Sequence, residues 1–133
     1  MNKYLFVLIS FAISYGAYGE SSAENSSGIG YKSVSEAYGA LRNKEGVEGS
    51  VQQGWVIFKD STDSSLWSFT PKEHPAHPAA IKRTVLEKNG ELYIAMKAMC
   101  GAEKLACDEL IQNFREMNEQ MKNDMDKKRE VSS

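Results

Sequence analysis

The clearest alternation of hydrophobic and polar positions surrounds Asn89-Gly90, in the second half of the chain. Asn-Gly favours a two-residue type I′ turn, so residues 79–100 are predicted to form an antiparallel hairpin. The turn also sets the register, with Lys88 opposite Glu91. One face of this hairpin then collects the hydrophobic residues Ile81, Val85, Leu92, Ile94, Met96, Ala98 and Cys100. The hairpin is therefore expected to lie half-buried, with this face toward a core.

Charged residues interrupt the hairpin pattern in two ways. Arg83 and Glu87 fall on the hydrophobic face, while Lys82 falls directly opposite Lys97 on the other face. Like charges in directly opposed positions repel each other. The lysine pair is expected either to splay into water or to serve in binding, and Arg83 joins it only if the strand twists or bulges.

Two segments show the spacing of amphipathic helices. The first, from about residue 34 to 45, begins at a capping box formed by Ser33 and Glu36, and its stripe comprises Val34, Ala37, Tyr38 and Leu41. The second extends from about residue 102 to 125, and its stripe comprises Cys107, Leu110, Phe114, Met117 and Met121. Core packing is the preferred interpretation of the second stripe, although methionine-rich stripes also form adaptable binding surfaces.

Two further segments, 54–60 and 65–69, are rich in aromatic and β-branched residues and are separated by a polar turn. They are predicted to form a strand pair, with Trp67 and Phe69 on one face. The fold class is therefore α+β: an N-terminal helix, a four-stranded antiparallel meander and a long C-terminal helix packed on the sheet. Because each helix has a single stripe, both are expected to cover one face of the sheet.

Cys100 and Cys107 are the two cysteines of the chain. In one continuous helix, residues seven apart lie about 10 Å apart along the axis, whereas disulfide Cα atoms lie about 4.4–6.8 Å apart. A disulfide therefore requires Cys100 to precede the helix that contains Cys107, with a chain reversal near Gly101. A redox site is disfavoured because the spacing is not C-x-x-C.

The N-terminus has the pattern of a secretory signal peptide. Lys3 precedes an apolar run of about ten residues, which is shorter than the roughly 20 needed to span a bilayer, and Ala17-Tyr18-Gly19 fits a cleavage site; a second candidate site follows Ala23. The predicted organisation is a signal peptide at 1–19, a flexible leader at 20–30, a single domain at 31–125 and a solvated tail at 126–133. Export would place the chain in the periplasm or outside the cell, where oxidising conditions favour the disulfide.

Removal of residues 1–19 removes one lysine and no acid, so the formal net charge changes from −2 to −3. No basic stripe remains that would indicate nucleic-acid binding. No stable membrane span is expected after cleavage.

His74 and His77 lie in the segment HPAHP, and each precedes a proline. A metal site needs three or four ligands, and no acidic or cysteine partner stands at motif spacing. Proline fixes its own φ and favours extended geometry in the residue before it, so the segment is interpreted as a semi-rigid connector. A small metal-binding protein or an enzyme that uses this loop remains the alternative.

Recognised catalytic patterns are missing: the sequence contains no G-x-S-x-G, no H-E-x-x-H and no phosphate-binding loop. No catalytic residue, metal ligand or cofactor is therefore assigned, and the protein is expected not to be an enzyme.

Several short motifs together resemble a group of small exported proteins of Gram-negative bacteria that have no assigned activity. They are GW at 54–55, LWSFTP at 66–71, HPAHPA at 74–79, KR at 82–83 and C-x-A-x-K-x-x-C-D from Cys100 to Asp108. Some similar sequences carry an automatic label as J-domain chaperones. A J domain is a helical hairpin with a His-Pro-Asp loop, whereas alanine follows both His-Pro pairs here. The resemblance implies a periplasmic or secreted location, and it supplies no catalytic residue that could be carried over to this chain.

The predicted function is that of an exported, non-enzymatic binding or accessory protein whose partner is another envelope or extracellular protein. The candidate recognition surface comprises His74, His77, Lys82, Arg83 and Lys97. A chaperone-like protein that exposes the methionine stripe of its last helix is a second alternative.

Overall fold

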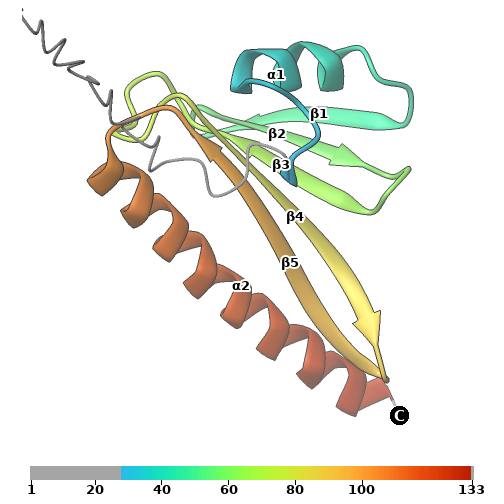
Figure 1. The fold of residues 1–133 in the computed structure, drawn as a ribbon. Coiled ribbons are helices and arrows are strands. Elements are labelled where there is room, and N and C mark those ends of the chain that lie inside the picture. The colour runs from blue at the N-terminus through green and yellow to red at the C-terminus, as the bar shows by residue number, and fades with distance from the viewer. Residues whose placement is uncertain (1–27, 133) are drawn as a thin grey trace, which may run out of the picture.

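The structure is a computed structural model that describes residues 28–132, so the predicted signal peptide lies outside the described residues. The described chain forms two helices and one antiparallel sheet whose strands follow sequence order (Figure 1). The elements are α1 (Val34–Arg42), β1 (Val47–Gln52), β2 (Trp55–Asp60), β3 (Ser65–Phe69), β4 (Ala79–Lys88), β5 (Glu91–Cys100) and α2 (Lys104–Ser132). The predicted α+β class, both helices and the meander order are confirmed.

The sheet has five strands rather than the predicted four, and β1 is the strand that the sequence pattern missed. Among residues 28–132 it pairs only with β2, and all of its residues except the partly buried Val47 are exposed. An exposed edge strand needs no alternating hydrophobic face, so its sequence VEGSVQ shows no strand periodicity. Gly49 fits this position because a Cβ there would lie 3.0 Å from the ring of Phe58.

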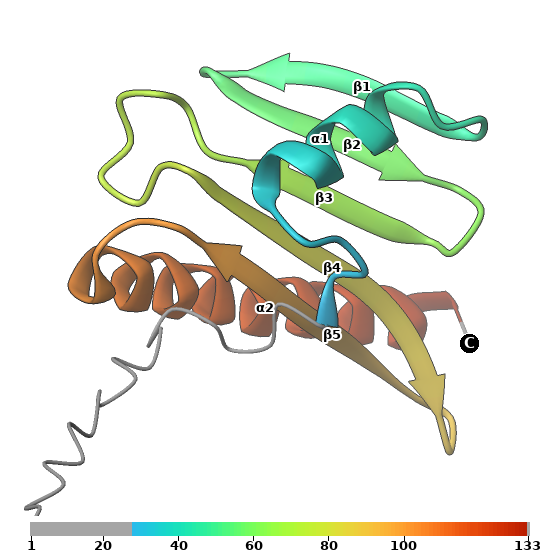
Figure 2. The ribbon, with the colours of Figure 1, turned by 45° about the horizontal axis from the view of Figure 1, so that its top comes forward.

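The helices lie on opposite faces of the sheet (Figure 2), which corrects the prediction that both cover one face. The core on the α1 side contains Ala37, Leu41, Phe58, Trp67, Phe69 and Ala80. The core on the α2 side contains Ile81, Ala98, Cys100, Leu110, Ile111 and Phe114. The neighbours Ala80 and Ile81 belong to different cores, so β4 is buried on both faces near its start. A stripe shows that a helix is covered on one side, but not which face of a sheet covers it.

The β4–β5 hairpin has the register predicted from Asn89-Gly90, with Lys88 opposite Glu91 and Lys82 opposite Lys97. β3 pairs with β4 only as far as Thr84, so the part of the hairpin beyond this residue extends past the rest of the sheet. This part, residues 85–94, is called the outer hairpin. α2 runs along one face of the β4–β5 hairpin, as Figure 1 shows.

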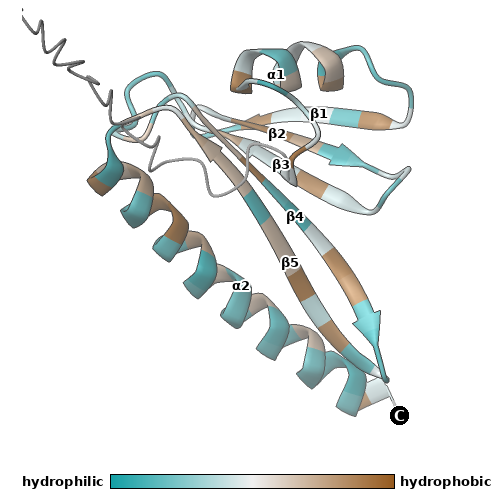
Figure 3. Ribbon diagram, in the orientation of Figure 1, coloured by the Kyte–Doolittle hydropathy of each residue, from teal (hydrophilic) through white to brown (hydrophobic). Residues whose placement is uncertain are grey.

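The buried residues of α2 all lie in its first half, from Ala106 to Phe114. Its second half is mostly hydrophilic in Figure 3. The predicted solvated tail is helical as far as Ser132, with exposed side chains from 127 to 132. Near the other end of the described chain, Ile29 is 2% exposed in the α1-side core, so the packed domain starts before the predicted boundary at residue 31.

The predicted disulfide joins the last residue of β5 to the first half of α2. Cys100 and Cys107 are bonded, with their Cα atoms 5.9 Å apart. Cys100 precedes the helix, which begins at Lys104, so the chain reverses between them as the spacing required. The bond therefore fixes the start of α2 against the sheet on the α2 side.

Candidate recognition surface

The outer hairpin is uncovered on its α1 side within the part of the chain that the structure describes. Cross-strand partners share a face, so Leu86 and Tyr93 lie side by side there, 49% and 42% exposed, although the Lys122 ammonium of α2 lies 5.9 Å from the Tyr93 ring centroid. A depression of about 260 Å³ includes Leu86 and is lined by Lys82, Thr84, Leu86, Ala95 and Lys97. These five residues and Tyr93 are called the open hairpin face, which combines exposed hydrophobic area with positive charge.

The two lysines of this face differ in their contacts. The Lys82 ammonium lies 3.0 Å from a carboxylate oxygen of Asp63 and 5.4 Å from the ring centroid of Trp67. Its charge is thus already paired with the β2–β3 turn. Lys97 is exposed and is the more accessible cation of the pair. The opposed lysines are tolerated because one of them turns toward an acid that sequence spacing did not reveal.

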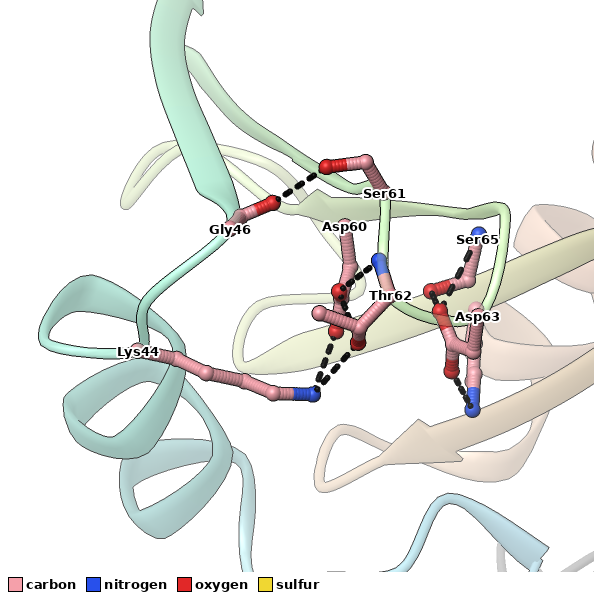
Figure 4. A network of polar contacts seen from close by, with 8 residues as sticks. Lys44, Gly46, Asp60, Ser61, Thr62, Asp63 and Ser65 are labelled. Atoms are coloured by element: carbon pink, nitrogen blue, oxygen red, sulfur yellow. Dashed lines mark hydrogen bonds and ion pairs between the residues drawn. The ribbon is translucent and has the colours of Figure 1, made fainter.

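A polar network holds the β2–β3 turn that supplies Asp63 (Figure 4). Asp60 is 1% exposed and lies 2.6 Å from the Lys44 ammonium, while Thr62 donates to it through both its backbone N–H and its hydroxyl. Burial alone raises the pKa of the Asp60 carboxyl, but these hydrogen bonds outweigh burial and lower its pKa below the usual 3.8. Asp63 accepts from the backbone and hydroxyl of Ser65. The turn is therefore joined both to the segment after α1 and to β4.

Arg83 lies on the α2 side and does not join Lys82 and Lys97. Its guanidinium is 5.0 Å from the ring centroid of Phe114, and Nη1 donates to the Met121 sulfur at 3.2 Å. Burial lowers the pKa of this guanidinium. No described carboxylate lies within ion-pair distance of it. The predicted participation of Arg83 in the surface required a twist or bulge that the continuous register of β4 does not contain.

The two histidines have different neighbours. His74 lies 5.3 Å from the ring of Trp55, which packs against the α2-side core, and its Nδ1 accepts from the Ala76 N–H at 3.0 Å. His77 instead has its Nδ1 3.1 Å from the Thr70 hydroxyl and lines a pocket of about 410 Å³ near α1. Residues 28–132 contain no group of three metal-ligating side chains. The histidines therefore support the loop in different ways and do not converge.

A larger groove runs along the edge of β5 that no other described strand pairs with, and the sequence pattern did not indicate it. Its volume is about 940 Å³, and it separates β5 from the flank of α2. Its lining residues are Gly28, Tyr93, Ile94, Met96, Lys97, Ala98, Ile111, Arg115, Asn118, Glu119 and Lys122. This set is called the edge groove. The α2 residues that line it flank the hydrophobic stripe of the helix. Their polar character in the sequence does not show that they border a groove.

No family model, curated protein or solved structure matches this chain. Within the described residues, neither helix has the length and hydrophobicity that a membrane crossing requires. The candidate surface therefore depends on the geometry of the protein's own residues.

Proposed function

We propose that this chain is an exported, non-enzymatic accessory protein that binds another envelope or extracellular protein through the open hairpin face. The observation that carries the proposal is the uncovered α1 side of the outer hairpin, where Leu86 and Tyr93 are exposed beside Lys97. Large exposed hydrophobic side chains grouped with polar neighbours are characteristic of protein-binding surfaces. The disulfide supports an oxidising compartment.

The chemistry of the open hairpin face also limits the partner. Leu86 and Tyr93 offer hydrophobic contact, and Tyr93 is of a residue type enriched in interfaces. Lys97 adds an accessible positive charge, whereas Lys82 is held by Asp63. A partner surface with hydrophobic residues next to a carboxylate is complementary to this arrangement.

The test compares two neighbouring residues of β4 that face opposite sides. Leu86→Glu places a charge on the open hairpin face, and Val85→Glu makes the same kind of change on the α2 side, where Val85 is 42% exposed. In affinity capture from an envelope fraction, wild type and Val85→Glu are expected to recover the same partner, and Leu86→Glu is expected to lose it. Isothermal titration with the purified partner then gives the affinity of each variant.

Melting temperatures of both variants serve as the folding control. Because both side chains are well exposed, neither change should lower the melting temperature by more than a few degrees. Equal partner affinity for all three proteins would remove the open hairpin face as the binding surface.

A further inference from the structure

We propose that two copies of this chain associate through β5, pairing antiparallel about Ile94 so that their sheets form one continuous sheet. The groups brought together are the free edge of β5, the edge groove beside it and two oppositely charged residues of the strand, Glu91 and Lys97. The proposal goes beyond the partner binding described above and does not depend on it, because strand pairing uses the backbone edge of β5, although Lys97, Tyr93 and Ala95 also belong to the open hairpin face.

The edge of β5 is long and regular. Within the described chain β5 pairs only with β4, and its ten residues keep an unbroken register from Glu91 to Cys100. It contains neither a proline nor a bulge, which are two of the devices that protect edge strands from pairing. The unpaired backbone groups along such a strand are a template for a further strand.

The edge groove provides room for that strand. Its lining includes Ile94 and Met96 from the α2 side of β5 and Tyr93 and Lys97 from the α1 side. A cavity that contacts both faces of one strand lies along the edge of the strand, and not over a single face. Arg115 and Lys122 of α2 also line it, and the Lys122 ammonium lies 5.9 Å from the ring centroid of Tyr93, so this contact must open when a second strand enters.

The sequence of β5 is complementary to itself in one register. Antiparallel pairing about Ile94 sets Lys97 opposite Glu91 twice, once from each copy, and sets Met96 opposite Leu92 and Ala95 opposite Tyr93. Opposite charges at directly paired positions stabilise a strand pair. Pairing about Ala95 instead places Lys97 opposite Tyr93 and Glu91 opposite Met99, so both ion pairs are lost.

Lys97 gives this pairing its selectivity. A lysine on an edge strand opposes pairing with most other strands, because its charge then faces an uncharged or like-charged residue. Glu91 of a second copy removes that penalty. Glu91 also accepts a hydrogen bond from the Tyr93 hydroxyl at 2.6 Å within its own chain, and Tyr93 lines the edge groove.

The experiment measures the mass of the mature protein by sedimentation equilibrium over a range of concentrations. Wild type is expected to show a reversible monomer–dimer equilibrium. Lys97→Glu and Glu91→Lys each convert two attractive pairs into two repulsive ones, so each should raise the dimer dissociation constant about tenfold or more. The double variant Glu91→Lys/Lys97→Glu restores opposite charges and should return to within about threefold of wild type by the same reasoning.

Restoration in the double variant separates pairing between copies from effects within one chain. The two residues are six positions apart on one strand, which is about 20 Å, so they do not contact each other in the monomer. Lys59→Glu, an equal charge change at an exposed residue of β2, is the control and should leave the equilibrium unchanged. A wild type that stays monomeric at its highest soluble concentration overturns the proposal. So does a dimer that is insensitive to the single changes or is not restored by the double change.

Discussion

At the scale of single residues, charges on this protein act mainly through their immediate partners. Lys82 and Lys97 occupy equivalent positions on paired strands, yet Asp63 holds only Lys82. Asp60 is almost fully buried, yet its hydrogen bonds with Lys44 and Thr62 hold its pKa below the usual value. The function of a charge here follows from the turn or helix that approaches it, and much less from its position in the strand.

Replacement of Asp60 by asparagine is expected to weaken the β2–β3 turn and to change the acid sensitivity of the fold. The lost ion pair and hydrogen bonds should cost about 1–2 kcal/mol of unfolding free energy at neutral pH. The folded state lowers the pKa of Asp60, so its stabilising effect is complete above the usual value of 3.8 and is lost as pH falls through the folded-state pKa. Urea denaturation between neutral pH and pH about 3 should therefore show a flatter pH dependence for Asp60→Asn than for wild type.

Asp124→Asn, at an exposed position on α2, is the matched control for this measurement. It should keep the pH dependence of wild type. Parallel pH profiles for wild type and Asp60→Asn would contradict the role assigned to Asp60.

Replacement of Arg83 by methionine is expected to leave stability unchanged or to increase it. The guanidinium is half-buried against Phe114 without a carboxylate among the described residues, and methionine retains most of the apolar stem without the cost of burying a charge. Thermal denaturation should give a melting temperature equal to or above that of wild type. A clear decrease, together with a loss of partner affinity, would return Arg83 to the recognition surface.

At the scale of elements, the sequence was most informative where local chemistry sets geometry. Asn89-Gly90 was sufficient to predict every pair in the β4–β5 hairpin, since the turn and the alternation agree. The spacing of Cys100 and Cys107 predicted where the chain must leave the strand before α2 begins. β1 escaped prediction because an exposed edge strand needs backbone pairing alone.

Removal of the disulfide by Cys100→Ser/Cys107→Ser should lower the unfolding free energy by about 2.5 kcal/mol, because the short loop no longer restricts the unfolded chain. Chemical denaturation of wild type with and without reductant should show a shift of similar size. The double variant should not respond to reductant. Equal midpoints for oxidised and reduced wild type would show that packing alone holds the start of α2.

At the scale of the whole molecule, the sheet lies between two hydrophobic cores, one on each of its faces. β4 begins with a continuous run of buried residues, Ala79, Ala80 and Ile81. Such a run of hydrophobic residues is typical of a strand that is covered on both faces, here by helices on opposite sides. The candidate surface was predicted only in part for a related reason. Register placed Lys82 beside Lys97, but only the three-dimensional arrangement shows that Arg83 faces α2 and that the histidines point into different surroundings.

The uneven burial of α2 has a consequence for how the protein loosens. Every fully buried side chain of this helix lies between Ala106 and Phe114, close to the covalent link at Cys107. Thermal fraying should therefore begin at Ser132 and proceed toward the disulfide. It would expose the α2 side of the outer hairpin before either core unfolds. Both faces of the outer hairpin would then be transiently exposed to solvent. The hairpin tip is therefore the expected first site of proteolysis or of pairing with a misfolded protein.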